Sequence, residues 1–267
     1  MQSLVSSGTE YSVLSRYKYA KCHTKRGRKN RGGWDSRCLF TQRSVHGKAN
    51  GMKAKRAKLK PTFSEERKFL TEGYLLTAGV DEVGRGCLAG PVTACAVILP
   101  CNVRRAWLKE VRDSKLLTHE KREYLFSFIE ETAVAIGTGV VQNDVIDSIG
   151  IGNASKLAMK YAIEQLNPAP DSLLIDFFKL PEVKLPQKGI IDGDALCYSI
   201  ACASIIAKVT RDLLMVELDT KYPGYGLTNH KGYGTKEHWR CITEKGLSPI
   251  HRLSFCHLGE RFTSDED

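Results

Sequence analysis

The stretch AGVDEVGRGCLAGP, residues 78–91, places two carboxylates side by side and follows them with a glycine–arginine–glycine run. The apolar residues before Asp81 are typical of a buried strand, so Asp81 and Glu82 stand where this strand ends. Neighbouring side chains of a strand point to opposite faces. The two acids can therefore serve one site only if the strand kinks or if one of them offers its backbone carbonyl. Gly84 and Gly86 allow such a kink, because glycine tolerates positive φ and the close approach of a ligand.

Two further acids occupy comparable positions later in the chain. Asp176 closes the apolar part of the run SLLIDFF (residues 172–178), and a carboxylate there is costly to bury unless something compensates for it. Asp194 lies just ahead of a long apolar helix, and taken alone it is most simply read as the N-cap of that helix. Acids at two strand ends and one helix start can instead converge on one edge of a sheet, where they repel each other unless divalent cations neutralise them.

The types of donor indicate which cations fit this cluster. It offers hard oxygen ligands without a Cys or His companion, which favours Mg²⁺ or Mn²⁺. Two such ions sharing carboxylates suit in-line displacement at a phosphate by water. The nine cysteines are scattered without a CxxC pair, which argues against a zinc ribbon and a disulfide framework. The chain also has no GxSxG elbow of the kind that serine hydrolases use.

From residue 61 onward the chain alternates short strand-like and helix-like segments. The apolar patterns predict strands over residues 75–83, 92–100, 134–142 and 172–178. They predict helices over residues 63–73, 118–133, 143–151, 153–167, 195–223 and 235–246. Strands clustered early, with helices and further strands after them, indicate an α/β protein whose sheet includes some antiparallel pairing.

The charge of the chain is concentrated in its first 60 residues. This segment holds 16 Lys or Arg and two acids, for a net charge of +14, whereas the whole chain carries +10 and residues 61–267 therefore carry −4. The segment shows no apolar periodicity, so we expect a basic, disordered extension. It is either an arm that grips nucleic acid or an artefact of a start site upstream of Met52. The remainder is expected to be a catalytic domain over residues 61–260 and an acidic tail over 261–267.

The composition carries no targeting signal. No apolar run approaches the ~20 residues of a membrane-spanning helix, and the N-terminus lacks the apolar core of a secretory signal. We therefore expect a protein of the cytoplasm. Nothing in the sequence suggests an obligate dimer, and we expect a monomer.

Four blocks of the sequence resemble, in the same order, the signature motifs of the bacterial ribonuclease HII (type 2 ribonuclease H) family. They are AGVDEVGRGCLAGPV (78–92), RDSKLLTHEKRE (112–123), ACASIIAKVTRD (201–212) and NHKGYGTKEHW (229–239). The resemblance covers roughly residues 61–258. It implies an α/β fold, namely a ribonuclease H-like mixed sheet flanked by helices, with a C-terminal helical extension. It also implies metal-dependent hydrolysis of the RNA strand of RNA–DNA hybrids and incision 5′ to single ribonucleotides embedded in duplex DNA, leaving a 3′-hydroxyl and a 5′-phosphate.

The resemblance also implies roles for individual residues. The metal-binding acids would be Asp81, Glu82 and Asp176, with Asp194 as the fourth active-site carboxylate. Seven positions match substrate contacts of the family: Gly84, Arg85, Gly86, Lys115, Ser204, Lys208 and Tyr233. Gly84 to Gly86 match the loop that reads the 2′-hydroxyl, the group that distinguishes RNA from DNA.

The other matched positions contact the sugar and the phosphates. Tyr233 matches a tyrosine that packs on the neighbouring deoxyribose and so favours an RNA-to-DNA junction. Lys115, Ser204 and Lys208 match phosphate contacts, and the last two share a helix face because they are four residues apart. The ordinary alternative for this pair is a buried helix serine and a lysine at the edge of the helix.

Three positions depart from the family pattern. Cys87 stands where proline is frequent, and Phe177 stands where glycine is common and so can narrow the site. The common KGD reads DGD here, which adds Asp192 beside the acids and suggests altered metal affinity.

Two other classes of function stay open from the sequence. A non-catalytic nucleic-acid-binding protein would explain the basic segment but not the four acids. A DNA junction nuclease of related fold would keep the acids yet need no reader of the 2′-hydroxyl.

Overall fold

The structure, a computed structural model, describes residues 59–256. The predicted basic extension lies almost entirely outside these residues, and so do the acidic tail and the expected end of the catalytic domain near residue 260. Those three assignments stay predictions.

Within residues 59–256, five strands form one mixed sheet in the order β3-β2-β1-β4-β5. The strands are β1 Thr77–Val83, β2 Val92–Ile98, β3 Ala135–Val141, β4 Ser172–Asp176 and β5 Gln187–Ile190. β1 and β3 both pair antiparallel with β2, whereas β4 runs parallel to β1 and β5 runs parallel to β4. The prediction of a mixed sheet is confirmed, and β5 is a strand that the apolar patterns did not reveal.

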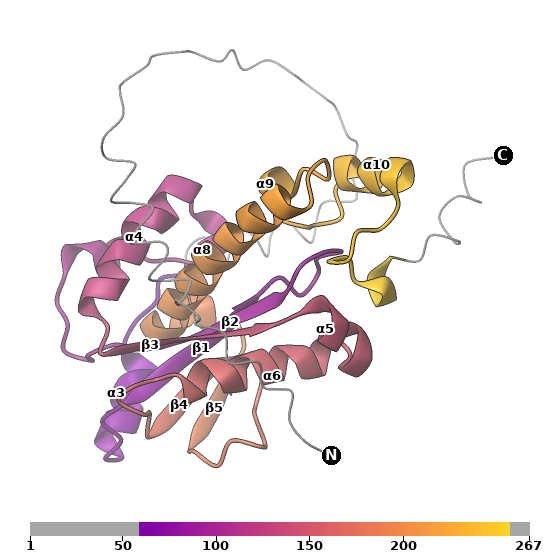
Figure 1. Cartoon of the computed structure of the whole chain (residues 1–267). Helices are drawn as coiled ribbons and strands as arrows, with labels where there is room; N and C mark the ends of the chain where they lie inside the picture. The colour runs from indigo at the N-terminus through magenta and orange to yellow at the C-terminus, as the bar shows by residue number, and fades with distance from the viewer. Residues whose placement is uncertain (1–58, 257–267) are drawn as a thin grey trace, which may run out of the picture. The chain divides into compact units, whose positions relative to one another are not determined.

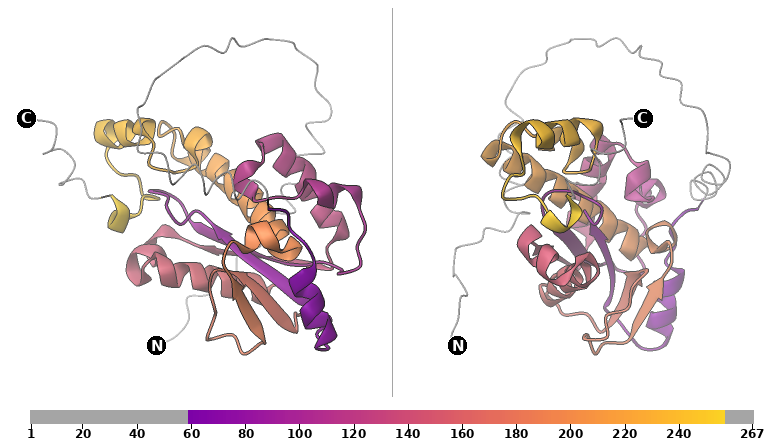
Figure 2. Two further views of the ribbon diagram at one scale, coloured as in Figure 1. Left: turned by 180° about the vertical axis from the view of Figure 1, so that it is seen from behind. Right: turned by 90° about the vertical axis from the view of Figure 1, so that its right-hand side faces the viewer.

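Helices cover both faces of this sheet (Figures 1 and 2). The α-helices of the described range are α3 Ser64–Thr71, α4 His119–Thr132, α5 Asn143–Ile149, α6 Ile151–Glu164, α7 Gly193–Leu196, α8 Tyr198–Lys221, α9 Leu227–His230 and α10 Lys236–Lys245. Three short 3₁₀ turns join them, at Ala106–Glu110, Ser114–Leu116 and Leu253–Phe255. None of the helices between residues 59 and 256 is long and apolar enough to cross a membrane.

Glycines allow two helices to lie directly against the sheet. A Cβ on Gly79 of β1 would stand 2.2 Å from the carbonyl carbon of Ser199, at the start of α8. A Cβ on Gly139 of β3 would stand 2.0 Å from the carbonyl oxygen of Ala158 in α6. Both distances are far below van der Waals contact, so α8 and α6 approach the backbone of the sheet from opposite faces.

The alternation of side chains along β1 assigns each residue to one of these faces. Ala78 and Val80 belong to the main apolar core, together with Ala158 and Met159 of α6. Gly79 faces α8, and the next residue on the same face is Asp81. The strand therefore directs the first acid toward α8 and the second, Glu82, toward the opposite side.

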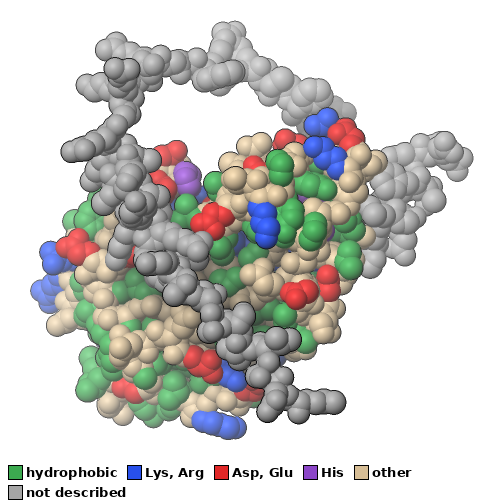
Figure 3. Space-filling view, viewed as in Figure 1, with side chains coloured by type: hydrophobic (Ala, Val, Ile, Leu, Met, Phe, Trp, Pro, Cys, Tyr) green, Lys and Arg blue, Asp and Glu red, His purple; other side chains and the backbone are tan. Residues whose placement is uncertain are grey.

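The C-terminal part of the described chain returns to the loop that follows β1. Cys87 forms an antiparallel bridge with Tyr233, and Ala89 forms one with His251. The predicted helical extension is thus present as α9 and α10, and it borders the glycine-rich loop. On the face seen in Figure 3, acidic and basic side chains of the described residues are interspersed, and they form no large patch of a single charge there.

Candidate active site

Two carboxylates meet where the parallel ladder between β1 and β4 ends. Val80 lies opposite Ile175 in the parallel ladder, so that the next residues, Asp81 and Asp176, come side by side. A pocket of about 550 Å³ opens at this point. Its lining residues are Asp81, Glu82, Val83, Gly84, Arg85, Gly86, Lys115, Asp176, Phe177, Ile191, Asp192 and Tyr233. Eight of the eleven residues singled out in the sequence are among them; Asp194, Ser204 and Lys208 are not.

Asp81 is buried beneath the pocket. Its Oδ1 accepts a hydrogen bond from the backbone N–H of Glu82 at 2.8 Å. Burial raises the pKa of Asp81 well above its usual range, and the negative charges of Glu82 and Asp176 raise it further. A hydrogen bond with Ser204 of α8 opposes this shift. A nearby positive charge would strongly stabilise the ionised form of a carboxyl in this position.

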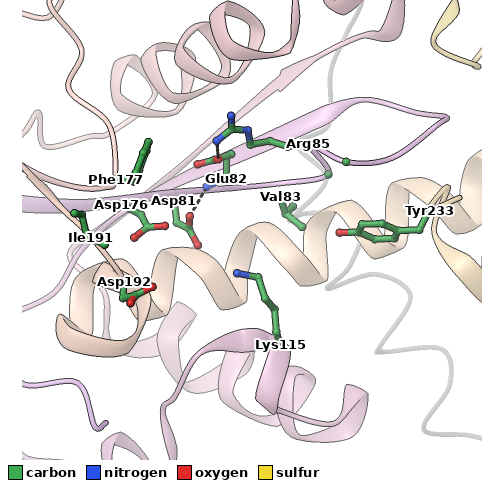
Figure 4. A pocket seen from close by; sticks show the side chains of 12 residues that line it. Asp81, Glu82, Val83, Arg85, Lys115, Asp176, Phe177, Ile191, Asp192 and Tyr233 are labelled. Carbon is green, nitrogen blue, oxygen red and sulfur yellow. Dashed lines mark hydrogen bonds and ion pairs between the residues drawn. The ribbon is translucent and has the colours of Figure 1, made fainter. Parts of the chain in front are cut away.

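Glu82 reaches the pocket from the other face of β1. The ladder to β2 runs without interruption through both acids, so the strand does not kink between them, and the chain turns only at Gly84, whose φ is +91°. The Glu82 carboxylate pairs with Arg85, with Nη1 and Oε1 3.2 Å apart (Figure 4). Burial raises the pKa of Glu82, while Arg85 opposes the rise and Asp176 adds to it.

Asp176 and Asp194 are held by the short helix α7 and its neighbours. Asp176 Oδ1 accepts a hydrogen bond from the backbone N–H of Gly193 at 2.8 Å. Asp194 is buried inside α7, and its Oδ2 lies 3.6 Å from Lys115 Nζ. The simpler reading of Asp194 as the N-cap of the long helix is wrong, because Cys197 occupies that position.

The donor set fits a small divalent cation. Glu82 Oε2 is buried and receives no hydrogen bond from any residue between 59 and 256, which is costly for a carboxylate oxygen. In this same range no three His, Cys, Asp or Glu side chains are arranged to hold one ion by themselves. Mg²⁺ keeps several water ligands and takes only one or two carboxylates, so the pair Asp81 and Asp176 is sufficient for it.

Two buried arginines hold the loop over residues 84–91, and no pattern in the sequence pointed to them. Arg252 is 0% exposed and donates to the carbonyl oxygens of Gly84 at 2.8 Å, Arg85 at 2.9 Å and Gly90 at 2.8 and 3.0 Å. Arg211 of α8 donates to the carbonyl oxygens of Pro91, Ala89 and Lys231. The backbone of the loop is therefore fixed by guanidinium groups from two distant segments.

The remaining residues of interest surround the pocket. Tyr233 lies on the opposite side of the pocket from Asp176 in Figure 4, and its side chain is partly exposed. Lys208 pairs with Asp212 at 2.7 Å, and its Nζ lies 5.8 Å from the centre of the Tyr233 ring. Ser204 is buried, with its Oγ 2.8 Å from Ser114 Oγ. Lys208 and Ser204 thus stand next to the pocket rather than in its wall.

Comparison with known proteins identifies the family and the fold of the chain. The family model described as ribonuclease HII matches residues 78–258. A ribonuclease HII of Dehalococcoides mccartyi (strain 195) is 57% identical over 202 residues, which cover 76% of this chain and 96% of the relative. One of Acetivibrio thermocellus is 52% identical, covering 71% of this chain and 73% of that protein. The crystal structure of the ribonuclease H2 from Pyrococcus horikoshii OT3 superposes with a TM-score of 0.55 at 26% identity, over 67% of this chain and 92% of that one.

The sheet is ribonuclease H2-like, and the match to the family model and its relatives makes the protein an endonuclease. Within that class, the chain belongs to the ribonuclease HII family, whose members are metal-dependent.

Proposed function

We propose that Asp81, Glu82 and Asp176 hold the divalent cations with which this ribonuclease HII cleaves the RNA strand of RNA–DNA hybrids and incises duplex DNA 5′ to single embedded ribonucleotides. The observation that carries the assignment is the meeting of Asp81 and Asp176 at the parallel ends of β1 and β4, beside a glycine-rich loop. The products would carry a 3′-hydroxyl and a 5′-phosphate. The cation would be Mg²⁺ or Mn²⁺, because all the donors are oxygen atoms.

Each acid has a separate task in this proposal. Asp81 and Asp176 face α8 together and supply carboxylate oxygens to the same position. Glu82 comes from the other face of β1, and it contributes either its main-chain carbonyl or its carboxylate after leaving Arg85. Asp194 supplies negative charge from α7 and orients Lys115. When bound, the cations polarise the scissile phosphate and lower the pKa of the attacking water.

The substrate contacts follow the outline of the pocket. The backbone of Gly84, Arg85 and Gly86 reads the 2′-hydroxyl, and Arg252 and Arg211 support this reading by fixing the loop. Tyr233 packs on the deoxyribose that follows the ribonucleotide. The charges of Lys115, beside Asp194, and of Lys208, beside Tyr233, attract phosphates of the substrate strand. Ser204 contacts a phosphate or, as a simpler role, hydrogen-bonds Asp81.

The partners and setting of the enzyme belong to the same proposal. RNA–DNA hybrids and ribonucleotide-containing duplexes are the expected partners. We expect a monomer that works in the cytoplasm.

The test is cleavage of a DNA duplex that carries one ribonucleotide, with and without Mg²⁺ or Mn²⁺. We expect incision 5′ to the ribonucleotide only when metal is present. Asp81→Asn and Asp176→Asn should each lower kcat by more than about 100-fold and leave hybrid binding largely intact. The reason is that each substitution removes a metal ligand needed for the reaction and not a contact with the sugar–phosphate backbone of the substrate. Glu131→Gln, an exposed acid of α4, is the matched control and should cleave normally.

Three results would change the assignment. Near-normal cleavage by either Asn variant would remove the metal roles given to the acids. Cleavage of an all-DNA junction without preference for ribonucleotides would indicate a junction nuclease. Binding without turnover in either metal would indicate a non-catalytic binding protein.

A further inference from the structure

Phe177 is an exposed aromatic residue in strained backbone, directly after the acid Asp176. Its side chain is 65% exposed, and its φ is +61°, in the left-handed region that glycine tolerates best. The N–H of Phe178 donates to the carbonyl oxygen of Asp176 at 2.6 Å, which closes a three-residue turn with Phe177 at its centre. Such turns with a positive central φ are rare and strained. A strained residue at a functional site suggests that its side chain has a task there.

The side chain of Phe177 belongs to a small apolar surface at the pocket. The Phe177 and Phe178 rings meet edge to face, with centroids 5.3 Å apart, and Phe178 in turn carries the Arg85 guanidinium 4.8 Å above its ring. Ile191 lines the same pocket and is 71% exposed. We call Phe177 and Ile191 the apolar shelf. Neither side chain carries a hydrogen-bonding group.

The shelf lies at one end of the pocket and Tyr233 lies at the other. Figure 4 shows Phe177 and Ile191 together on one side, Tyr233 on the far side, and Asp81 between them. A polynucleotide strand that passes over the acids from Tyr233 therefore reaches the shelf next.

We propose that the apolar shelf packs against the sugar of the nucleotide on the 5′ side of the scissile phosphate and favours deoxyribose there. This inference rests on the proposed function, in which Tyr233 contacts the deoxyribose 3′ of the ribonucleotide and the acids take the phosphate 5′ of it. The strand direction then brings the preceding nucleotide to Phe177 and Ile191.

The chemistry of the shelf selects the sugar as the group it contacts. In a duplex the bases are paired and stacked, so an aromatic side chain at the groove meets sugars and not base faces. Asp192 stands beside the shelf in the pocket, and its negative charge disfavours a phosphate there, which leaves the carbon face of the sugar. A 2′-hydroxyl pressed against Phe177 and Ile191 would lose its hydrogen bonds to water without replacement. The shelf therefore penalises ribose at this position, and an isolated ribonucleotide becomes a better substrate than continuous RNA.

The experiment compares wild type with Phe177→Gly and Phe177→Tyr on two duplexes. One duplex carries a single ribonucleotide, and the other carries four in a row, with each cut position mapped. Phe177→Gly should raise KM for the single-ribonucleotide duplex about 10-fold with kcat nearly unchanged, on the scale of losing a partly buried apolar contact with the sugar. Internal cuts in the four-ribonucleotide tract, where ribose precedes the scissile phosphate, should change much less. Phe177→Tyr should retain the KM of wild type.

Stability measurements separate this role from a structural one. Glycine relieves the positive φ, so Phe177→Gly should unfold at the same denaturant concentration as wild type or higher. Leu75→Ala is the control and should leave KM unchanged. Leu75 is an apolar residue about as exposed as Phe177, and it lies just before the start of β1, away from the pocket.

Several outcomes would overturn the shelf. An unchanged KM in Phe177→Gly would do so, and so would a KM that rises equally for both duplexes. A fall in kcat at constant KM would mean that residue 177 acts only by orienting Asp176. If wild type itself fails to cut the single-ribonucleotide duplex in either metal, the proposed function fails, and the shelf fails with it. Cleavage by wild type with no effect of the variants removes the shelf alone.

Discussion

Arg252 offers the sharpest test of how the loop over residues 84–91 is held, through the substitution Arg252→Lys. The guanidinium makes four hydrogen bonds to three carbonyl oxygens, those of Gly84, Arg85 and Gly90. A lysine carries its three donors on one nitrogen and cannot reproduce the planar fork of arginine. We therefore expect the substituted lysine to satisfy one or two of the three carbonyls and to leave the others buried without a donor.

The cost can be worked from these contacts. A hydrogen bond from a charged donor contributes about 1.5–3 kcal/mol, and leaving its buried acceptor unpaired carries a further penalty. The loss of two such bonds gives a destabilisation of roughly 3–6 kcal/mol, before any relaxation of the loop. Burial already lowers the pKa of Arg252 to about 10. The same burial would push the ammonium of a lysine toward its neutral form, so substitution weakens the charge as well as the geometry.

The expected effect on activity follows from the position of the loop. If residues 84–86 shift by about 1 Å, kcat/KM on a single-ribonucleotide duplex should fall by about 10- to 100-fold. Stability is measured by urea unfolding, with the slope checked for constancy, and activity is measured at a temperature at which the variant is fully folded. Arg240→Lys is the matched control, since Arg240 is 67% exposed in its side chain and pairs with Glu244 on the same helix.

A variant that behaves like the control would refute this role of Arg252. An Arg252→Lys protein within about 0.5 kcal/mol of wild type, with unchanged kcat/KM, would mean that the loop does not depend on the guanidinium. A destabilised variant that still discriminates ribonucleotides normally would separate loop stability from loop function.

Two further predictions concern protonation and metal affinity. Burial lowers the pKa of His238 to about 4, so between about pH 6.5 and pH 4 the unfolded chain binds a proton at this residue and the folded chain does not. The free energy of unfolding, measured with urea, should therefore fall as the pH is lowered through this range, by up to about 2 kcal/mol at pH 5. His238→Gln should make the free energy of unfolding less dependent on pH. Asp192→Lys removes a negative charge from the pocket wall and adds a positive one, so half-maximal activity should need on the order of 10-fold more Mg²⁺. Asp192→Asn should show a smaller shift in the same titration, and equal metal dependence of all three proteins would contradict the effect of charge.

The sequence predicted the strand-end acids because their local pattern is simple. An apolar run followed by an acid marks a buried strand that ends at a polar site, and both β1 and β4 have this form. The strict alternation of a strand also predicted that Asp81 and Glu82 point to opposite faces. What the pattern did not contain is the pairing partner, since the parallel register of Val80 with Ile175 is decided by packing across the sheet.

Other elements were missed for physical reasons that can be named. β5 is four residues long and only partly buried, and it exists because it pairs with β4 rather than because of its own apolar pattern. Arg252 and Arg211 are both 0% exposed, whereas arginine is usually found at the surface, so no local rule assigns them to the interior. Asp194 resembled an N-cap because the sequence does not reveal that a separate short turn, α7, precedes α8.

The acids and the loop over residues 84–91, which we propose reads the substrate, are built by different parts of the chain. Asp81 and Asp176 depend on neighbouring strands of the sheet. The loop after β1 depends on the C-terminal extension: the N–H of Leu88 donates to Gly232, and the N–H of Arg252 donates back to Leu88, each at 2.8 Å. Changes in the extension can therefore alter which nucleotide is recognised while the carboxylates stay in position. Changes in the strands that carry the acids have a different effect, because the loss of Asp81 or Asp176 removes the proposed metal site itself.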